Sequence, residues 1–94
     1  MRVSIGELCE QEGIEQQTLV ELVEHGVAAP MAGLEPPDWV FDTTSVFWLK
    51  RAVRLQRDLE IDWLAVSMVI ELQRRNERLE RQLEHYRQRV ERLQ

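Results

Sequence analysis

The sequence predicts a mainly α-helical fold, in which residues 1–62 form a winged helix-turn-helix module and residues 63–94 form a long helix with a heptad seam for dimerisation. Three observations support this prediction. Two short amphipathic segments lie on either side of Gly13. Glycine and proline residues interrupt the chain over residues 27–42, and apolar residues recur with heptad spacing in its last third.

Local capping signals mark the first two helices. Ser4 opens an S-x-x-E capping box, which predicts a helix that begins at Ile5 and ends at Gly13. Apolar residues spaced three and four apart predict a second helix over about residues 15–25, and Gly26 follows as its terminator. Two short helices joined by a tight turn indicate a helix-turn-helix.

Residues 27–42 are expected to form a wing beside the two helices. Their prolines and Gly33 exclude a continuous helix. The segments Val27–Ala29 and Trp39–Phe41 have the apolar composition of short strands. A small β wing, with these two strands joined by the glycine- and proline-containing loop, is therefore predicted.

Two further helices complete the predicted module and its extension. A third helix is expected over about residues 45–59, because Asp42 to Ser45 offer several N-caps. Asp62 is the expected N-cap of the last helix, over residues 63–93. Seven residues of this helix alternate four and three positions apart, at the a and d positions of a heptad repeat: Leu72, Asn76, Leu79, Leu83, Tyr86, Val90 and Leu93.

These seven residues, the heptad seam, are mostly apolar and must pack either on the chain's own body or on a second chain. Their flanks are polar all the way to Gln94, which favours a second chain. We therefore expect a homodimer through the last helix. Asn76 occupies an a position, where it can specify register or strand number; alternatively, it meets water at the edge of the coil. The heptad pattern is compatible with both parallel and antiparallel pairing.

Charge is unevenly spread along the chain. Residues 1–48 contain nine acidic residues and one basic residue, a net of −8, whereas residues 49–94 contain eight acidic and eleven basic residues, a net of +3. We expect nucleic acid to repel the acidic half and a basic protein surface to attract it, although single carboxylates also cover ordinary solvated helix faces. The candidate partner-binding residues are four acidic residues and one tryptophan: Glu7, Glu10, Glu21, Glu24 and Trp39. The alternative for Trp39 is packing in the hydrophobic core.

The sequence contains no recognisable catalytic constellation, cofactor motif or metal-ligand set, so we expect a binding protein rather than an enzyme. Cys9 lies on the apolar face of the first helix and is expected to be a structural thiol. His25 and His85 lie in different elements, and no second cysteine completes a zinc site. The lone cysteine, the absence of a signal-peptide pattern and the absence of a spanning apolar run lead us to expect a cytoplasmic protein.

Several segments resemble known families. Residues 17–30, QTLVELVEHGVAAP, resemble the second helix and following turn of the MerR-type winged helix, which enters the DNA major groove in MerR regulators. Residues 39–42 (WVFD), 51–55 (RAVRL) and 59–63 (LEIDW) resemble the central signature of the CbpM family of chaperone modulatory proteins. The heptad tail is also in the same place as in that family, so the resemblance covers nearly the whole chain.

The sequence departs from MerR regulators where they bind DNA. Those regulators usually carry Arg and Tyr after the Thr-Leu pair of the recognition helix, where this chain has Val20 and Glu21. The wing arginine expected near residue 40 is Val40, and the only base among residues 1–48 is Arg2. Without phosphate-binding cations the main source of DNA affinity is lost, which indicates a scaffold that has kept its packing and lost its DNA function.

The resemblance to CbpM implies a function. Members of that family bind the J-domain of CbpA, a DnaJ-like co-chaperone that also binds DNA, and inhibit both its co-chaperone and its DNA-binding activities. J-domains carry a basic helix that docks on the Hsp70 chaperone DnaK, so an acidic module covering this helix would compete with DnaK. One alternative is a purely structural dimerisation module. The other is a MerR-type DNA-binding transcriptional regulator that contacts phosphates through bases of the third helix: Lys50, Arg51, Arg54 and Arg57.

Overall fold

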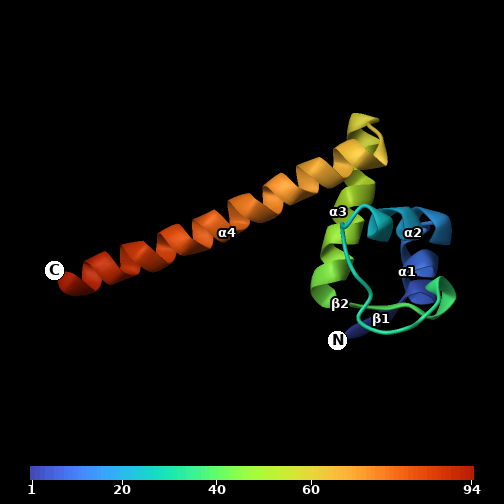
Figure 1. The fold of residues 1–94 in the computed structure, drawn as a ribbon, viewed down its shortest axis with the longest axis horizontal. Helices are drawn as coiled ribbons and strands as arrows, with labels where there is room; N and C mark the ends of the chain where they lie inside the picture. Colours follow the sequence, from blue (N-terminus) through green and yellow to red (C-terminus); the bar gives the residue numbers. More distant parts are fainter.

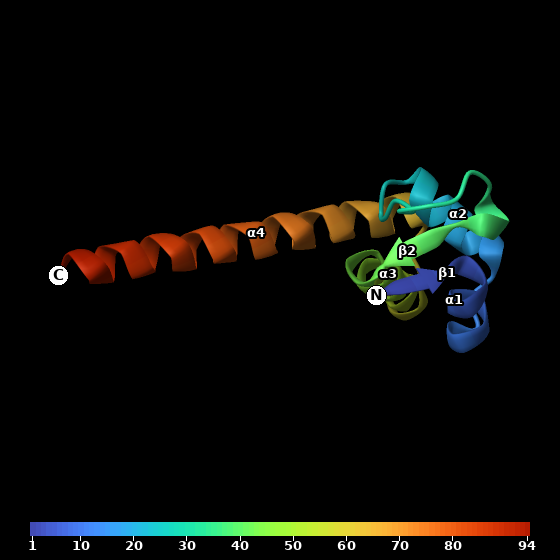
Figure 2. The same cartoon turned by 90° about the horizontal axis from the view of Figure 1, so that it is seen from below.

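The computed structural model describes residues 1–94 and confirms the predicted fold class, a small helical body followed by one long helix. Figures 1 and 2 show α1, α2 and α3 packed together beside a two-stranded sheet, with α4 projecting from this body as a rod. The molecule is accordingly elongated, with extents of 54 × 30 × 21 Å. Its elements in chain order are β1 (Arg2–Ser4), α1 (Ile5–Glu12), α2 (Gln16–Glu24), the 3₁₀ helix η1 (Pro36–Asp38), β2 (Val40–Asp42), α3 (Thr43–Leu59) and α4 (Trp63–Leu93).

Three of the four α-helices begin at the side-chain caps that the sequence offers. The Oγ of Ser4 accepts a hydrogen bond of 3.1 Å from the backbone N–H of Glu7. The carboxylates of Asp42 and Asp62 accept 2.7 Å and 2.8 Å bonds from the N–H groups of the third residues after them. These caps satisfy donors that a helix leaves unpaired at its first turn. The predicted helices are confirmed, with α3 beginning two residues earlier than expected, directly after its Asp42 cap.

The predicted strand Val27–Ala29 is wrong, because α2 uses the beginning of this segment to terminate itself. The N–H of Val27 donates to the carbonyl of Leu22 at 2.9 Å, and the N–H of Gly26 donates to the carbonyl of Val23 at 3.0 Å. This is a Schellman motif, in which Gly26 adopts the left-handed conformation with φ 78°. Val27 and Leu22 are both buried, which supplies the apolar contact that accompanies such a motif.

The strand that pairs with β2 comes instead from the N-terminus. β1 and β2 run antiparallel, with Val3 opposite Phe41, while the loop before β2 adds only an isolated bridge between Ala32 and Val40. Trp39 precedes β2 rather than belonging to it. Gly33 is required in this loop: its φ is 99°, and a Cβ there would lie 2.3 Å from the backbone carbonyl oxygen of Asp38.

One hydrophobic core joins the body to the first turns of α4. Its thirteen buried residues include Val66 and Ile70 of α4, together with residues of α1, α2, β2, α3 and the loops after α1 and α2. Arg74 ties α4 to the turn after α2, because its guanidinium donates to the backbone carbonyls of Gly26 and Val27. None of the helices combines the length and the apolar character needed to cross a membrane.

Candidate functional site

The acidic surface, defined as Glu7, Glu10, Glu21 and Glu24, lies on the outer faces of α1 and α2. Glu7 and Glu10 are exposed and three residues apart, so they share one side of α1. Ile5 and Leu8, which are buried, point the other way into the core. Glu21 is half-buried and Glu24 is exposed, and they likewise share the side of α2 opposite buried Leu19 and Leu22.

The four carboxylates therefore lie in two pairs, one on α1 and one on α2, and these two helices pack against each other. None of the four carboxylates of the acidic surface forms an ion pair. Glu12, which also belongs to α1 but not to this surface, does form one: its carboxylate lies 2.9 Å from the ammonium of Lys50. The acidic surface is therefore charged and free to meet a partner.

Trp39 lies between η1 and β2, half-buried against the core. Its ring meets that of Phe41 edge-on, with centroids 6.2 Å apart, and its backbone carbonyl accepts a 2.9 Å hydrogen bond from the N–H of Ile5, the first residue of α1. Because η1 packs against both α1 and α2, Trp39 is close to both acidic helices. A half-buried indole at this place offers only part of its surface to a partner.

In a DNA-binding helix-turn-helix, the second helix would enter the major groove, and here that helix is α2. It contains no basic residue, and its charged side chains are Glu21 and Glu24. His25, at its C-cap, is exposed. A second helix is therefore present at the place of a recognition helix, but the cations that bind phosphate are missing from it.

The heptad seam is solvent-exposed along its whole length. Every residue from 75 to 94 is exposed, because α4 extends away from the body as a rod (Figure 1). Leu79 is 62% exposed and Tyr86 60% exposed, whereas apolar side chains of this size are usually buried. Such a continuous apolar stripe on a monomer marks an interaction surface.

The exposed stripe is longer than the heptad pattern alone indicates. Leu64 and Met68 of α4 are about as exposed as Leu72, at 59%, 61% and 64%. Their spacing of four residues continues the stripe towards the start of the helix. A strict heptad register would select Ala65 and Val69 instead, but these are half-buried. Leu64 and Met68 could not be identified from the sequence, because only the structure shows which side of α4 the body covers.

Polar side chains on α4 support the helix beside the seam. Glu71 and Arg75, four residues apart, form an ion pair at 3.3 Å, and the Nε of Arg81 donates at 3.4 Å to the backbone carbonyl of Glu77. The amide of Asn76 donates to Glu80 at 3.3 Å, so its polar group is satisfied on the helix surface. These contacts are exposed, and each contributes on the order of 0.3 kcal/mol to the stability of the helix.

The side chains that could hold a metal ion or act as a nucleophile do not form a cluster. No group of three or more His, Cys, Asp or Glu side chains is arranged to hold a metal ion. Cys9 is half-buried against the core, and burial raises the pKa of its thiol, which disfavours the nucleophilic thiolate. His25 and His85 belong to different elements and are both exposed.

Comparison with known proteins is consistent with this architecture. Residues 3–88 match the model of the MerR HTH family of regulatory proteins. A chaperone modulatory protein CbpM of Pseudomonas entomophila (strain L48) is 40% identical over 65 residues, which are 69% of this chain and 63% of that relative's length. One of Pseudomonas putida (strain GB-1) is 33% identical over 86 residues, covering 92% of this chain and 84% of the relative. One of Citrobacter koseri is 34% identical over 76 residues, covering 81% and 74%.

The two kinds of match agree with each other and with the fold. The family model covers both the helix-turn-helix body and most of α4, and the Pseudomonas putida alignment covers nearly the same part of the chain. The chain therefore belongs to the MerR-type helix-turn-helix family and, by its similarity to several members, to the chaperone modulatory proteins named CbpM.

Proposed function

We propose that this protein is a chaperone modulator that binds the J-domain of a DnaJ-like co-chaperone of the CbpA type and inhibits its co-chaperone and DNA-binding activities. It acts by binding and not by catalysis, in the cytoplasm, where the co-chaperone works with DnaK. The observation that carries the proposal is the acidic surface on α1 and α2, together with Val20 and Glu21 at positions where MerR regulators usually carry Arg and Tyr.

Charge complementarity explains how such a contact would inhibit. The basic helix of a J-domain is the part that docks on DnaK, and an acidic partner held against it would exclude DnaK from the same residues. Trp39 would add a partly exposed aromatic anchor beside the carboxylates, since aromatic side chains supply much of the energy of protein contacts.

The heptad seam has a separate role in this proposal. It would join two copies of the chain through α4 and so present two acidic bodies in one homodimer. The seam and the acidic surface belong to different elements, the seam to α4 and the acidic surface to α1 and α2. In this account residues 1–62 bind the partner and residues 63–94 form the dimer.

Charge reversal tests the acidic surface. The double variant Glu21→Lys with Glu24→Lys is expected to weaken binding of a labelled J-domain by about tenfold or more at low salt, with a smaller effect at high salt because screening removes the attraction. Fluorescence anisotropy of the labelled J-domain measures both affinities.

A matched control is available on α4, away from the acidic surface. Glu84→Lys with Glu91→Lys changes the net charge by the same amount at exposed positions outside the heptad seam. We expect it to keep the affinity of the parent protein within about twofold. Equal affinities of the acidic-surface variant and the parent protein at low salt would contradict the proposed contact.

A further inference from the structure

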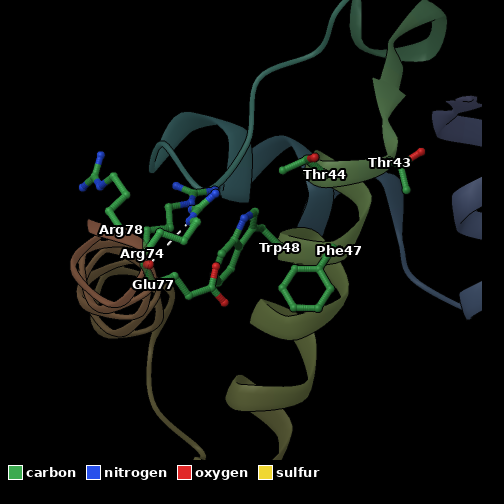
Figure 3. A pocket seen from close by; sticks show the side chains of 8 residues that line it. Thr43, Thr44, Phe47, Trp48, Arg74, Glu77 and Arg78 are labelled. Carbon is green, nitrogen blue, oxygen red and sulfur yellow. Dashed lines mark hydrogen bonds between the residues drawn. The ribbon is translucent and has the colours of Figure 1, made fainter. Parts of the chain in front are cut away.

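A groove opens in the corner between the N-terminal turn of α3 and the middle of α4. Its volume is about 460 Å³, and α3 contributes Thr43, Thr44 and the ring of Phe47 to its lining. Figure 3 shows the Trp48 ring between Phe47 and the α4 side chains Arg74 and Glu77. Phe47 is 50% exposed although it is a large apolar side chain, so this wall of the groove is apolar and open to a partner.

The opposite wall of the groove is positively charged. It carries Arg74, Arg78 and Arg81 against a single carboxylate, that of Glu77, which leaves a net charge of +2. Arg74 is occupied within the protein, by two backbone carbonyls and by the Trp48 ring, 5.0 Å from the guanidinium carbon. Arg78 and Arg81 also line the groove, and neither of them is bound to the body of the protein in this way.

Arg78 and Arg81 are weakly paired within the chain. The carboxylate nearest to Arg78 is that of Glu71, at 3.9 Å, and the Nε of Arg81 donates to a backbone carbonyl at 3.4 Å rather than to a carboxylate. A guanidinium has five donors in a planar fork, so both arginines keep most of their donors for a ligand. Planar bidentate pairing with carboxylates is what arginine does best.

The groove lies on the side of α4 away from the heptad seam. Arg81 is two residues from both Leu79 and Leu83, and at about 100° per residue it projects from the opposite side of the helix. The α4 helix of a second copy paired through the seam would therefore lie on the other side of α4 from the groove.

We infer that this groove is a second docking site, which takes an acidic peptide segment carrying an aromatic or leucine side chain. The apolar side chain packs on Phe47, and the carboxylates pair with Arg78 and Arg81. This surface is distinct from the acidic surface on α1 and α2, because it selects partners of the opposite charge. The inference therefore stands independently of the proposed J-domain contact.

Calorimetric titration of the full chain at low salt with the blocked peptide acetyl-Glu-Glu-Phe-Glu-Glu-Leu-Glu-Glu-amide tests the inference. We expect saturable binding to the parent protein and a loss of about tenfold or more in the variant Arg78→Glu with Arg81→Glu. Phe47→Ala is expected to weaken the same peptide, and the parent protein is expected to bind a peptide with Ser in place of Phe and Leu less tightly.

The control reverses two exposed arginines outside the groove, Arg54→Glu with Arg92→Glu, so that the net charge changes equally. Circular dichroism verifies that each variant is folded. The inference is overturned by absence of saturable binding to the parent protein, or by equal losses in groove and control variants. It is also overturned if Phe47→Ala and the Ser peptide have no effect, or if a DNA oligonucleotide binds the groove in place of the peptide. A groove variant that changes the oligomeric state instead of peptide affinity would assign the groove to a second copy.

Discussion

Single polar residues decide where the helices of this protein begin. Ser4, Asp42 and Asp62 each cap a helix with one side-chain oxygen. In each case this oxygen accepts a hydrogen bond from the backbone N–H of the residue three positions later. These signals are local, which is why the helix starts could be predicted from the sequence. The strand that pairs with β2 could not be predicted in this way. β1 is nearly forty residues away in the sequence, and this pairing depends on tertiary packing.

Residue-scale electrostatics give a pH-dependent prediction at Asp42. The backbone N–H of Ser45, followed by its hydroxyl, lowers the pKa of the Asp42 carboxyl by bonding its ionised form. Because the pKa is lower in the folded state, the contribution to stability is present above the carboxyl's ordinary pKa of about 4 and is lost as pH falls through the depressed value.

Asn also caps helices but does not titrate, so Asp42→Asn isolates this effect. We expect the Tm of the parent protein to exceed that of the variant at neutral pH, with the difference shrinking towards zero on acidification to about pH 2. Thermal unfolding followed by circular dichroism measures it. A Tm difference that is constant across this range would show that the ionised carboxylate contributes nothing specific.

At the scale of elements, α4 has two apolar sides with different roles. Val66 and Ile70 are buried against the body, whereas the stripe from Leu64 to Leu93 is exposed on the other side. The heptad part of the stripe was predictable, because its spacing repeats over the whole second half of the helix. Its extension through Leu64 and Met68 was not, since periodicity does not say which face the body of the protein covers.

The proposed dimer predicts a strong effect of a charge in the seam. Leu83→Asp would bury a carboxylate between two helices, at a cost of about 3 kcal/mol, which is about a hundredfold in the dissociation constant. Gln88→Asp adds the same charge at an exposed position outside the heptad seam and should leave association unchanged. Sedimentation velocity over a range of concentrations measures both. A parent protein that is monomeric throughout would contradict the proposed role of the seam.

At the scale of the whole molecule, the chain separates charge. The carboxylates of the acidic surface lie on α1 and α2, while three of the seven arginines of α4 line the groove beside α3. Composition alone predicted the acidic half, but the groove depends on how α3 and α4 meet and could not be found from spacing. The division into a binding module, residues 1–62, and a dimerisation helix, residues 63–94, stays a proposal, because the first turns of α4 also complete the core.

The central claim is that the acidic helix-turn-helix body binds a J-domain instead of DNA. Its most direct test is calorimetric titration of this protein with the isolated J-domain of the CbpA-type co-chaperone from the same organism, at two salt concentrations. We expect saturable binding that weakens with salt, with one J-domain bound per protomer. Absence of binding at both salt concentrations, in a sample that circular dichroism shows to be folded, would contradict the claim.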